Sequence, residues 1–375
     1  MRSDPHFPSA DRSHTLRLTR LIAAAWLIAA LSLLAACSSP AASPTPAPTP
    51  SLAKEIILYN WAGYMPQPVL DAFTAEFGVK VTYEVYETPE QAVENIQARQ
   101  AYDVVVMGNE MIPALMADGL LAEIDYRNVP NFKNVSANFR DLSYDPGNRH
   151  SVPFNWGTTG LLVRSDLVAE PATRWADLWD KRYAGKVAVW PIESELIPIA
   201  LKSLGYSVNS ENPAELEAAL ERLLELKKNV FFWDLDAPSI VPPLLSGEAV
   251  IADGWAYDAL TGRDENEAIV YVLPEEGTIL WGDNFAIPAS SANKRTAELF
   301  LNFLRRPEIG AQIANELFYA NANEAARALI DPDVLSDPLI FPPEDALRNA
   351  EILLPLSPEG QALHDDIWAR FMAAR

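Results

Sequence analysis

The alternation of short apolar strands with helical segments after Lys54 is the feature that most constrains the fold. The runs EIILY, VKVTYEVY and YDVVVM are rich in β-branched and aromatic residues, and helical patterns separate them at about 66–77 and 90–99. Strands that alternate with helices favour parallel pairing, because a parallel connection needs a long crossover segment. The sequence therefore predicts an α/β fold in which a mainly parallel sheet is flanked by helices.

The same alternation continues through a second unit of the chain. SVPFNWGTTGLLV is predicted to be a strand that crosses into this unit, and its WGTTG portion is interpreted as a flexible hinge. Further strands are expected at GKVAVW, EAVIADGW and NFAIPAS, and helices at about 197–204, 213–226, 294–304, 307–317 and 357–375. About 320 residues follow Lys54, which is enough for two lobes, and the chain is expected to cross between them more than once.

Residues 1–36 have the pattern of a lipoprotein signal peptide. A basic region with Arg12, Arg17 and Arg20 precedes the apolar run LIAAAWLIAALSLLAA, which is too short to span a membrane readily, and LAAC ends at Cys37. Cys37 is the only cysteine, so we expect it to be lipidated and the mature chain to contain no internal disulfide. The Ser/Pro/Ala-rich residues 37–53 are expected to form a tether. The predicted location is extracytoplasmic, with a lipid anchor in the cell membrane.

Composition excludes several classes of function. A formal net charge of −22 argues against nucleic acid and anionic lipid headgroups as partners and favours cationic ligands. The chain has four histidines, two of them within residues 1–36, and it lacks GxSxG, HExxH, CxxC and Walker-type glycine motifs. We therefore expect neither an enzyme, nor a metal site, nor a cofactor.

Aromatic residues stand beside carboxylates or other aromatics where predicted strands end. Ligands of α/β proteins bind beyond the carboxyl ends of the strands, so these positions are the candidates for a binding site. A flexible cation with methylene segments needs carboxylates for its charged ends and aromatic faces for its methylenes. The pairs are Trp61 with Tyr64, Trp255 with Asp258, and Trp281 with Asp283.

Several strings together carry a family resemblance over about residues 55–327. They are YNWAGY, WGTTGLLV, RWADLW, LGYS, ADGWAYDAL, PEEGTILWGDNFAIPASSANK, FLNFLRRPE and FYANANEAAR. In this combination the chain resembles the spermidine/putrescine-binding proteins of bacterial polyamine ABC transporters. The resemblance implies a type II periplasmic-binding-protein fold, capture of a polyamine, and delivery to ABC permease subunits. It implies lobe 1 at residues 54–158 with 283–327, and lobe 2 at 159–282 with 328–375.

The resemblance also implies roles for individual residues. The aromatic box would consist of Trp61, Tyr64, Trp255, Trp281 and Tyr319. Asp283 would be the central ammonium-binding acid, Glu195 the acid of the second lobe, and Asp258 the acid of the putrescine-preferring branch.

This sequence departs from the family pattern within the pocket. Ala62 and Gly63 stand where a hydroxyl or an acid often follows the first tryptophan. Gly108 or Asn109 replaces a Ser or Thr, with Glu110 as a candidate additional acid, and Ile192 replaces an aspartate, with Glu193 as the second candidate. These changes preserve a cation site but leave the polyamine open.

Two alternatives remain at the level of sequence. The first is a protein of the same fold that binds another cation, such as thiamine or a quaternary ammonium compound. The second is a sensor whose loaded form signals to a membrane partner. A monomer is expected, because a receptor that closes by hinge motion needs free lobes.

Overall fold

The computed structural model describes residues 51–232 and 239–374. Its strands form one sheet with the order β2-β1-β3-β9-β4-β7-β5-β6, while β8 and β10 pair with β4 and β11 pairs with β9. The leader, Cys37 and most of the expected tether lie outside the described residues. Within the described part, no helix is long and apolar enough to cross a membrane.

The first part of the chain has the predicted β-α-β-α-β order. β1 pairs in parallel with both β2 and β3, as the alternation of strands and helices requires. Thr88 caps α3 by accepting a hydrogen bond from the Gln91 N–H at 3.2 Å, and Gly78 ends α2 with a φ of 67°. The elements are β1 (Glu55–Trp61), α2 (Gln67–Phe77), β2 (Lys80–Tyr86), α3 (Pro89–Gln97), β3 (Val104–Gly108) and α4 (Ile112–Ala117).

The second part contains another parallel group, in which β5 pairs with β6 and β7. Its elements are β5 (Val187–Val189), α5 (Glu193–Ser203), α6 (Pro213–Leu226), β6 (Val230–Phe232), α7 (Val241–Ser246), β7 (Ile251–Trp255), α8 (Ala256–Glu265) and β8 (Ile269–Val272). The prediction placed the start of α5 at about residue 197, which is wrong. The interior Pro198 obscured the first turn, which begins at Glu193 and includes Glu195.

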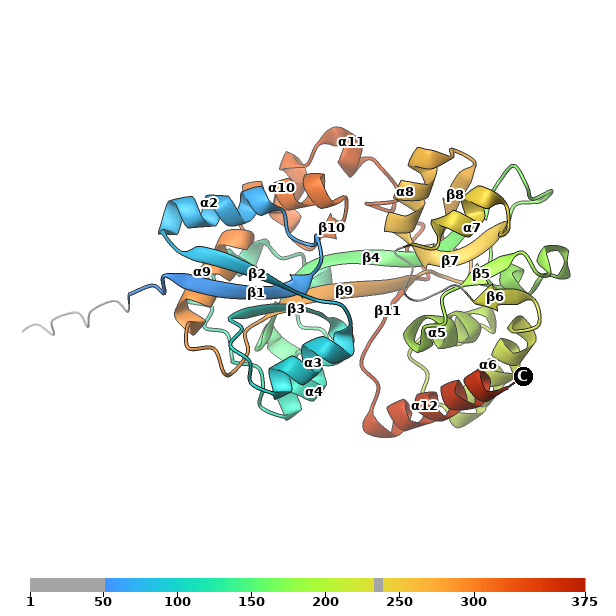
Figure 1. Ribbon diagram of the computed structural model, residues 1–375, viewed down its shortest axis with the longest axis horizontal. Coiled ribbons are helices and arrows are strands. Elements are labelled where there is room, and N and C mark those ends of the chain that lie inside the picture. The colour runs from blue at the N-terminus through green and yellow to red at the C-terminus, as the bar shows by residue number, and fades with distance from the viewer. Residues whose placement is uncertain (1–50, 233–238, 375) are drawn as a thin grey trace, which may run out of the picture. The chain divides into compact units, whose positions relative to one another are not determined.

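Two long strands join the parallel groups. β4 (Ser151–Arg164) and β9 (Ile279–Ala286) run side by side and antiparallel through the middle of the sheet (Figure 1). β9 also pairs antiparallel with β3, and β4 with β7, so the sheet is parallel at its two ends and antiparallel in its centre. The expectation of mainly parallel sheets therefore holds for the outer strands only.

The apolar core lies on both faces of each strand group (Figure 1). Around β1 and β3, α2 and the helices α9 (Lys294–Leu304) and α10 (Pro307–Leu317) cover one face, and α3 and α4 cover the other. Around β5 and β7, α5, α6 and α12 (Pro358–Ala373) cover one face, and α7 and α8 the other.

The segment after α10 packs back on that helix. It contains β10 (Ala320–Asn321), α11 (Pro332–Leu335) and β11 (Glu351–Ile352). Ile330, Val334 and Phe341 are buried against Ala311 and Ala314 of α10. The chain then continues to α12, which is buried at Ile367 and Phe371 against the β5 group.

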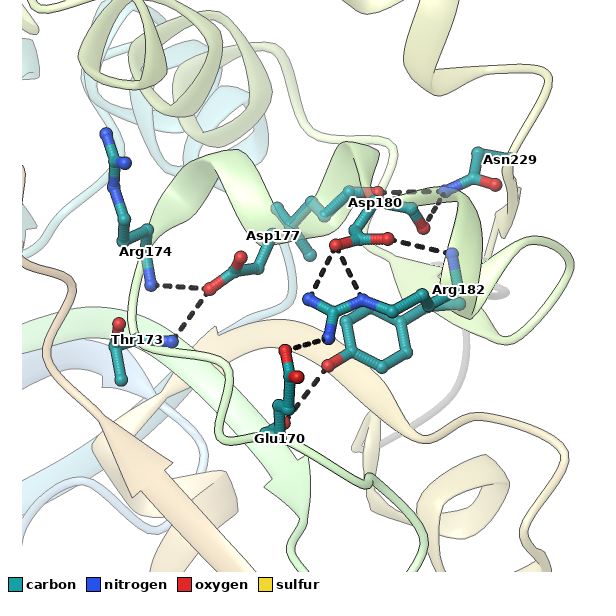
Figure 2. A network of polar contacts seen from close by, with 9 residues as sticks. Glu170, Thr173, Arg174, Asp177, Asp180, Arg182 and Asn229 are labelled. Carbon is teal, nitrogen blue, oxygen red and sulfur yellow. Dashed lines mark hydrogen bonds and ion pairs between the residues drawn. The ribbon is translucent and has the colours of Figure 1, made fainter.

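The connection between β4 and β5 is held by a network of charged groups (Figure 2). Asp177 accepts hydrogen bonds from the backbone N–H groups of Thr173 and Arg174, at 2.8 and 2.9 Å, and so caps a short 3-10 helix. Arg182 donates to Asp180 at 2.7 Å. These charges are satisfied by one another, so the network stabilises the loop.

Candidate functional site

The register of the sheet brings the ends of β1 and β3 beside Asp283 in the interior of β9. β1 ends at Trp61, and Tyr64 lies in the turn that follows. β3 ends at Gly108, which pairs with Asp283 on β9. Asp283, Tyr64 and the loop after β3 therefore meet at one edge of the first strand group, although they are far apart in sequence.

Tyr64 and Asp283 form the central polar contact of this edge. The Tyr64 hydroxyl donates a hydrogen bond of 2.9 Å to Asp283 Oδ2. Burial raises the pKa of Asp283 to about 7, the Tyr64 hydrogen bond lowers it, and the charge of Glu110 raises it. The phenol therefore stabilises the ionised form of a carboxylate that has no basic partner among the described residues.

Aromatic rings extend from Tyr64 across the site. Tyr319 lies edge-on to Tyr64 at 5.2 Å and to Trp281 at 5.8 Å between ring centroids. Trp281 packs over Gly157 of β4, where a Cβ would approach the indole Cε2 to 2.7 Å. Gly157 has no positive φ, so the close approach of Trp281 is a sufficient reason for glycine in WGTTG. The structure thus brings Tyr64, Tyr319, Trp281 and Asp283 together.

A second carboxylate, that of Glu195, lies beside the other strand group. Glu195 is 7% exposed, and its Oε1 accepts a 3.1 Å hydrogen bond from the indole N–H of Trp255. Trp255 in turn stacks on Trp190, with ring centroids 6.0 Å apart. Burial raises the pKa of Glu195 to about 7, the Trp255 hydrogen bond lowers it, and the charge of Glu110 raises it.

Glu110 connects the two carboxylates electrostatically. Its charge raises the pKa of both Asp283 and Glu195, so all three acids belong to one cluster. The Glu110 carboxylate occupies the space that a Cβ at residue 108 would need, which accounts for glycine at this position. Surrounding protein raises the pKa of Glu110 although part of its side chain is open to solvent. The departure from the family pattern at 108–110 therefore adds an acid to the cluster.

Three candidate residues have other contacts. Trp61 packs on Tyr86, with ring centroids 4.4 Å apart. Asp258 is 3% exposed and caps α8, since it accepts hydrogen bonds from the Trp255 N–H at 3.2 Å and the Ser239 hydroxyl at 2.9 Å.

Glu193 faces α12, away from the acid cluster. Its Oε1 accepts from the Gln361 side chain at 3.4 Å. Burial raises the pKa of Glu193 to about 7, and the neighbouring Asp365 raises it as well. The expected compensation for Ile192 by Glu193 therefore has no support in these contacts.

Sequence reasoning missed residues that lie beside the site. Tyr257 is 45% exposed and stacks on Tyr319 at 5.6 Å with an interplanar angle of 16°. Asn109, by contrast, was named from the sequence as a replacement for a Ser or Thr; its buried Nδ2 donates no hydrogen bond to the described residues, while its Oδ1 accepts from Asn284 at 2.8 Å. Asp253 is fully buried in β7. An acid within the apolar run AVIADGW was the signal that could have identified Asp253.

A cavity of about 380 Å³ adjoins the aromatic rings at Tyr257. Its walls come from α8, the end of α10 and the α11 region, and it is lined by Tyr257, Leu260, Thr261, Arg263, Asp264, Phe318, Asp333, Val334, Asp337 and Ile340. Among the described residues, no group of three or more His, Cys, Asp or Glu could hold a metal ion.

Two known proteins of similar sequence are named for binding polyamines. The chain is 35% identical to the spermidine/putrescine-binding periplasmic protein of Escherichia coli over 299 residues, 79% of this chain and 85% of that protein. It is 30% identical to a putrescine-binding periplasmic protein of Pseudomonas aeruginosa over 345 residues, 86% of this chain and 93% of that one.

Solved structures show the same fold. A spermidine/putrescine ABC transporter substrate-binding protein from Streptococcus pneumoniae matches with a TM-score of 0.78 and 28% identity, covering 85% of this chain and 99% of that chain. Residues 69–342 match the family model described as bacterial extracellular solute-binding protein. The chain therefore belongs to the family of bacterial extracellular solute-binding proteins.

Proposed function

We propose that this protein captures a polyamine, putrescine or spermidine, and delivers it to the permease subunits of an ABC importer. The relatives in Escherichia coli and Pseudomonas aeruginosa are named for binding spermidine and putrescine, and the Streptococcus pneumoniae protein is named as part of an ABC transporter. The observation that carries the proposal is the pairing of two desolvated acids, the half-buried Asp283 and the buried Glu195, with aromatic rings.

The chemistry of a polyamine matches the groups that the site leaves without partners. Glu195 Oε2 is buried, and no described residue donates to it with hydrogen-bond geometry. A buried carboxylate without a hydrogen-bond donor is unfavourable by several kcal/mol, and a primary ammonium group supplies up to three donors. The rings of Tyr319 and Trp281 offer faces to the methylene segments between the ammonium groups.

The same argument disfavours the alternative cations. A quaternary ammonium group donates no hydrogen bond, so it would leave the buried Glu195 Oε2 without a donor. Thiamine has a single charged ring and an aminopyrimidine, whereas the acids form two ends, one at Tyr64 and the other at Trp255. A ligand with two separated ammonium groups fits this arrangement better.

Within the proposed site, we assign direct ligand contact to Tyr64, Glu110, Glu195, Trp255, Trp281, Asp283 and Tyr319. Trp61 is proposed to support the site by packing on Tyr86, which itself lies near Asp283 and Glu110. Asp258 is proposed to act through the Trp255 backbone that it caps. Glu193 is proposed to have no ligand contact.

We further propose two lobes that close on the ligand about β4 and β9. The lobe division follows the strand groups, with residues 54–158 and 283–327 in lobe 1 and 159–282 in lobe 2. The packing of Ile330, Val334 and Phe341 on α10 favours moving the stretch from 328 to about 341 into lobe 1, with only the remainder up to 375 in lobe 2. Small-angle scattering with and without putrescine tests this, because absence of compaction would rule out closure.

Lipidation at Cys37, extracytoplasmic anchoring through that lipid, and a monomeric state are part of the proposal. They rest on the LAAC motif and on the need of a closing receptor for free lobes. Mass spectrometry of the N-terminal peptide from native membranes tests the lipid. We propose no catalytic role.

The decisive experiment is calorimetric titration of the purified protein with putrescine, spermidine and thiamine. Tight one-to-one binding of a polyamine, lost in Asp283→Asn, is the expected result. Heat from thiamine, together with none from either polyamine, would overturn the ligand assignment while leaving the fold intact.

A further inference from the structure

Asp253 is a buried acid that the proposed ligand contacts do not use. It lies in β7, has no exposed surface, and accepts one hydrogen bond at Oδ1 from the Trp190 N–H at 3.1 Å. Its Oδ2 is buried and has no partner among the described residues. An aspartate whose only function was to accept from Trp190 would need one oxygen, so the second oxygen requires an explanation.

Glu195 has the same half-satisfied arrangement. Its Oε1 accepts from Trp255, while Oε2 is buried without a partner among the described residues. Burial, followed by the charge of Glu195, raises the pKa of Asp253 well above its usual range. Trp190 donates to Asp253, Trp255 donates to Glu195, and the two indole rings stack at 6.0 Å, so the two carboxyls lie on one pair of stacked tryptophans. The buried Thr159 hydroxyl lies beside Glu195 and lowers its pKa by hydrogen bonding.

The surroundings of this pair contain further acids. Asp258 of α8 raises the pKa of Asp253, and Glu110, which follows β3, raises that of Glu195. The phenol of Tyr271 on β8 also lies near Glu195. None of the ion pairs of the described residues includes Asp253 or Glu195. Two adjacent buried carboxyls without a counter-charge cannot both ionise at low energy, so one of them holds a proton.

We propose that Asp253 and Glu195 form a carboxyl pair that shares one proton in the free protein and releases this proton when a ligand ammonium group binds at Glu195. Asp253 is a positioning residue in this scheme, because it acts through Glu195. The inference rests on the proposed contact between Glu195 and the ligand. The proton passes to solvent, and the positive charge of the bound ammonium group takes its place beside the carboxyl pair.

This arrangement has a consequence for specificity. Once the shared proton is lost, the ionised Glu195 favours a primary ammonium group, which donates hydrogen bonds to its oxygens. A ligand without N–H donors would not compensate the loss of the shared proton. Asp253 therefore selects for amines at the Glu195 end of the site.

The test is titration of the full-length protein with putrescine at pH 7 in buffers of different ionisation enthalpy, which gives the number of protons released. The variants are Asp253→Asn, which keeps the acceptor for the Trp190 N–H, and Asp118→Asn, an exposed acid as the control. We expect Asp253→Asn to release roughly one-half to one proton fewer per ligand and to bind about tenfold more weakly at pH 8. The control should match the wild type.

Infrared difference spectra provide a second readout that does not depend on affinity. The wild type should lose protonated-carboxyl absorbance on addition of putrescine, and Asp253→Asn should lose less of it, because Asp283 still gives up its proton but the pair no longer holds one. Unaltered proton release and an undiminished loss of this absorbance in Asp253→Asn would overturn the inference while the polyamine function stands. Absence of polyamine binding by the wild type would overturn both.

Discussion

The Tyr64 hydroxyl donates a 2.9 Å hydrogen bond to Asp283 Oδ2, joining residues 219 positions apart in the chain. The pairing of Gly108 with Asp283 across β3 and β9 sets this contact. Asp283 is thereby held in an environment where burial raises its pKa to about 7 and the phenol lowers it. Binding of a cation therefore favours the ionised form of the Asp283 carboxyl, whereas burial in the folded protein favours its protonated form.

Asp283→Asn should change ligand affinity and folding stability in opposite directions. Loss of the charge removes a charge-assisted hydrogen bond, so polyamine affinity should fall by about 10- to 100-fold. Without ligand, the variant should be more stable at pH 8, with Tm higher by about 2–4 °C, because a desolvated carboxylate is removed. The pKa of Asp283 is raised in the folded state, so the wild type gains stability as the pH falls below 7. The difference in Tm between the variant and the wild type should therefore shrink at pH 5.5. Calorimetry and thermal unfolding at pH 8 and 5.5 measure both effects, with the exposed Asp118→Asn as the control. A variant that is less stable at pH 8 would contradict the argument.

Tyr64→Phe should act through the ionisation of Asp283. The phenylalanine keeps the edge-on ring contact with Tyr319 but removes the donor to Asp283. Because this hydrogen bond lowers the pKa of Asp283, its loss should raise that pKa above about 7. Affinity should fall severalfold at pH 7 and recover in part at pH 8.5. Titrations at the two pH values measure this, and a loss that does not depend on pH would indicate a direct contact as the main role of the hydroxyl.

Binding by the wild type should depend on pH near neutrality. The pKa values of Asp283 and Glu195 are both raised to about 7 by burial, so both acids are increasingly protonated below that pH. A cation binds the ionised forms, and affinity should therefore decrease by about tenfold per pH unit for each carboxyl that must ionise. Titration with putrescine from pH 8 to 5.5 measures the slope. A flat profile over this range would show that neither acid needs to lose a proton.

Gly157→Ala should disturb the site without removing any of its side chains. The added Cβ would approach the Trp281 indole Cε2 to 2.7 Å, so the ring has to move. We expect a loss of affinity of about tenfold, since ring faces contribute about 0.5–2 kcal/mol to cation binding. Trp281→Phe and the double variant complete a thermodynamic cycle. If Gly157→Ala acts through the indole, its effect should be smaller in the Trp281→Phe background. Additive losses would show that the backbone of β4 is responsible instead.

The sequence predicted the strand ends and therefore most of the site, because apolar runs and their following residues can be read locally. Tyr64 was found in this way, whereas Trp281 and Asp283 lie inside β9, which spans Ile279–Ala286 and not the predicted NFAIPAS. Their mutual contacts could not be found, since these depend on which strands pair and in which register. The start of α5 was misplaced because Pro198 usually marks a helix boundary.

The role of Asp258 could not be assigned from the sequence alone. An acid three residues after Trp255 fits a ligand-binding pattern and a helix cap equally well at the level of sequence. Only the hydrogen bonds from the Trp255 N–H and Ser239 distinguish the second role. Asp253 was missed because a strand interior is not where a binding acid is sought, and its half-satisfied state is visible only in three dimensions.

A buried ion pair ties the C-terminal segment to the β5 group and gives a prediction for stability. Lys202 of α5, whose side chain is 8% exposed, pairs with Glu351 of β11. Glu351→Gln would leave the ammonium group buried without a counter-charge, so we expect a loss of about 2–4 kcal/mol in the free energy of unfolding. Lys202→Met removes the buried charge and keeps an apolar chain of similar length. It leaves Glu351, which is 31% exposed and also accepts from Ser207, in contact with water, and should therefore cost less than Glu351→Gln. Urea unfolding of both variants measures the difference, and a larger loss in Lys202→Met would mean that the ammonium group stabilises β11 through contacts other than this pair.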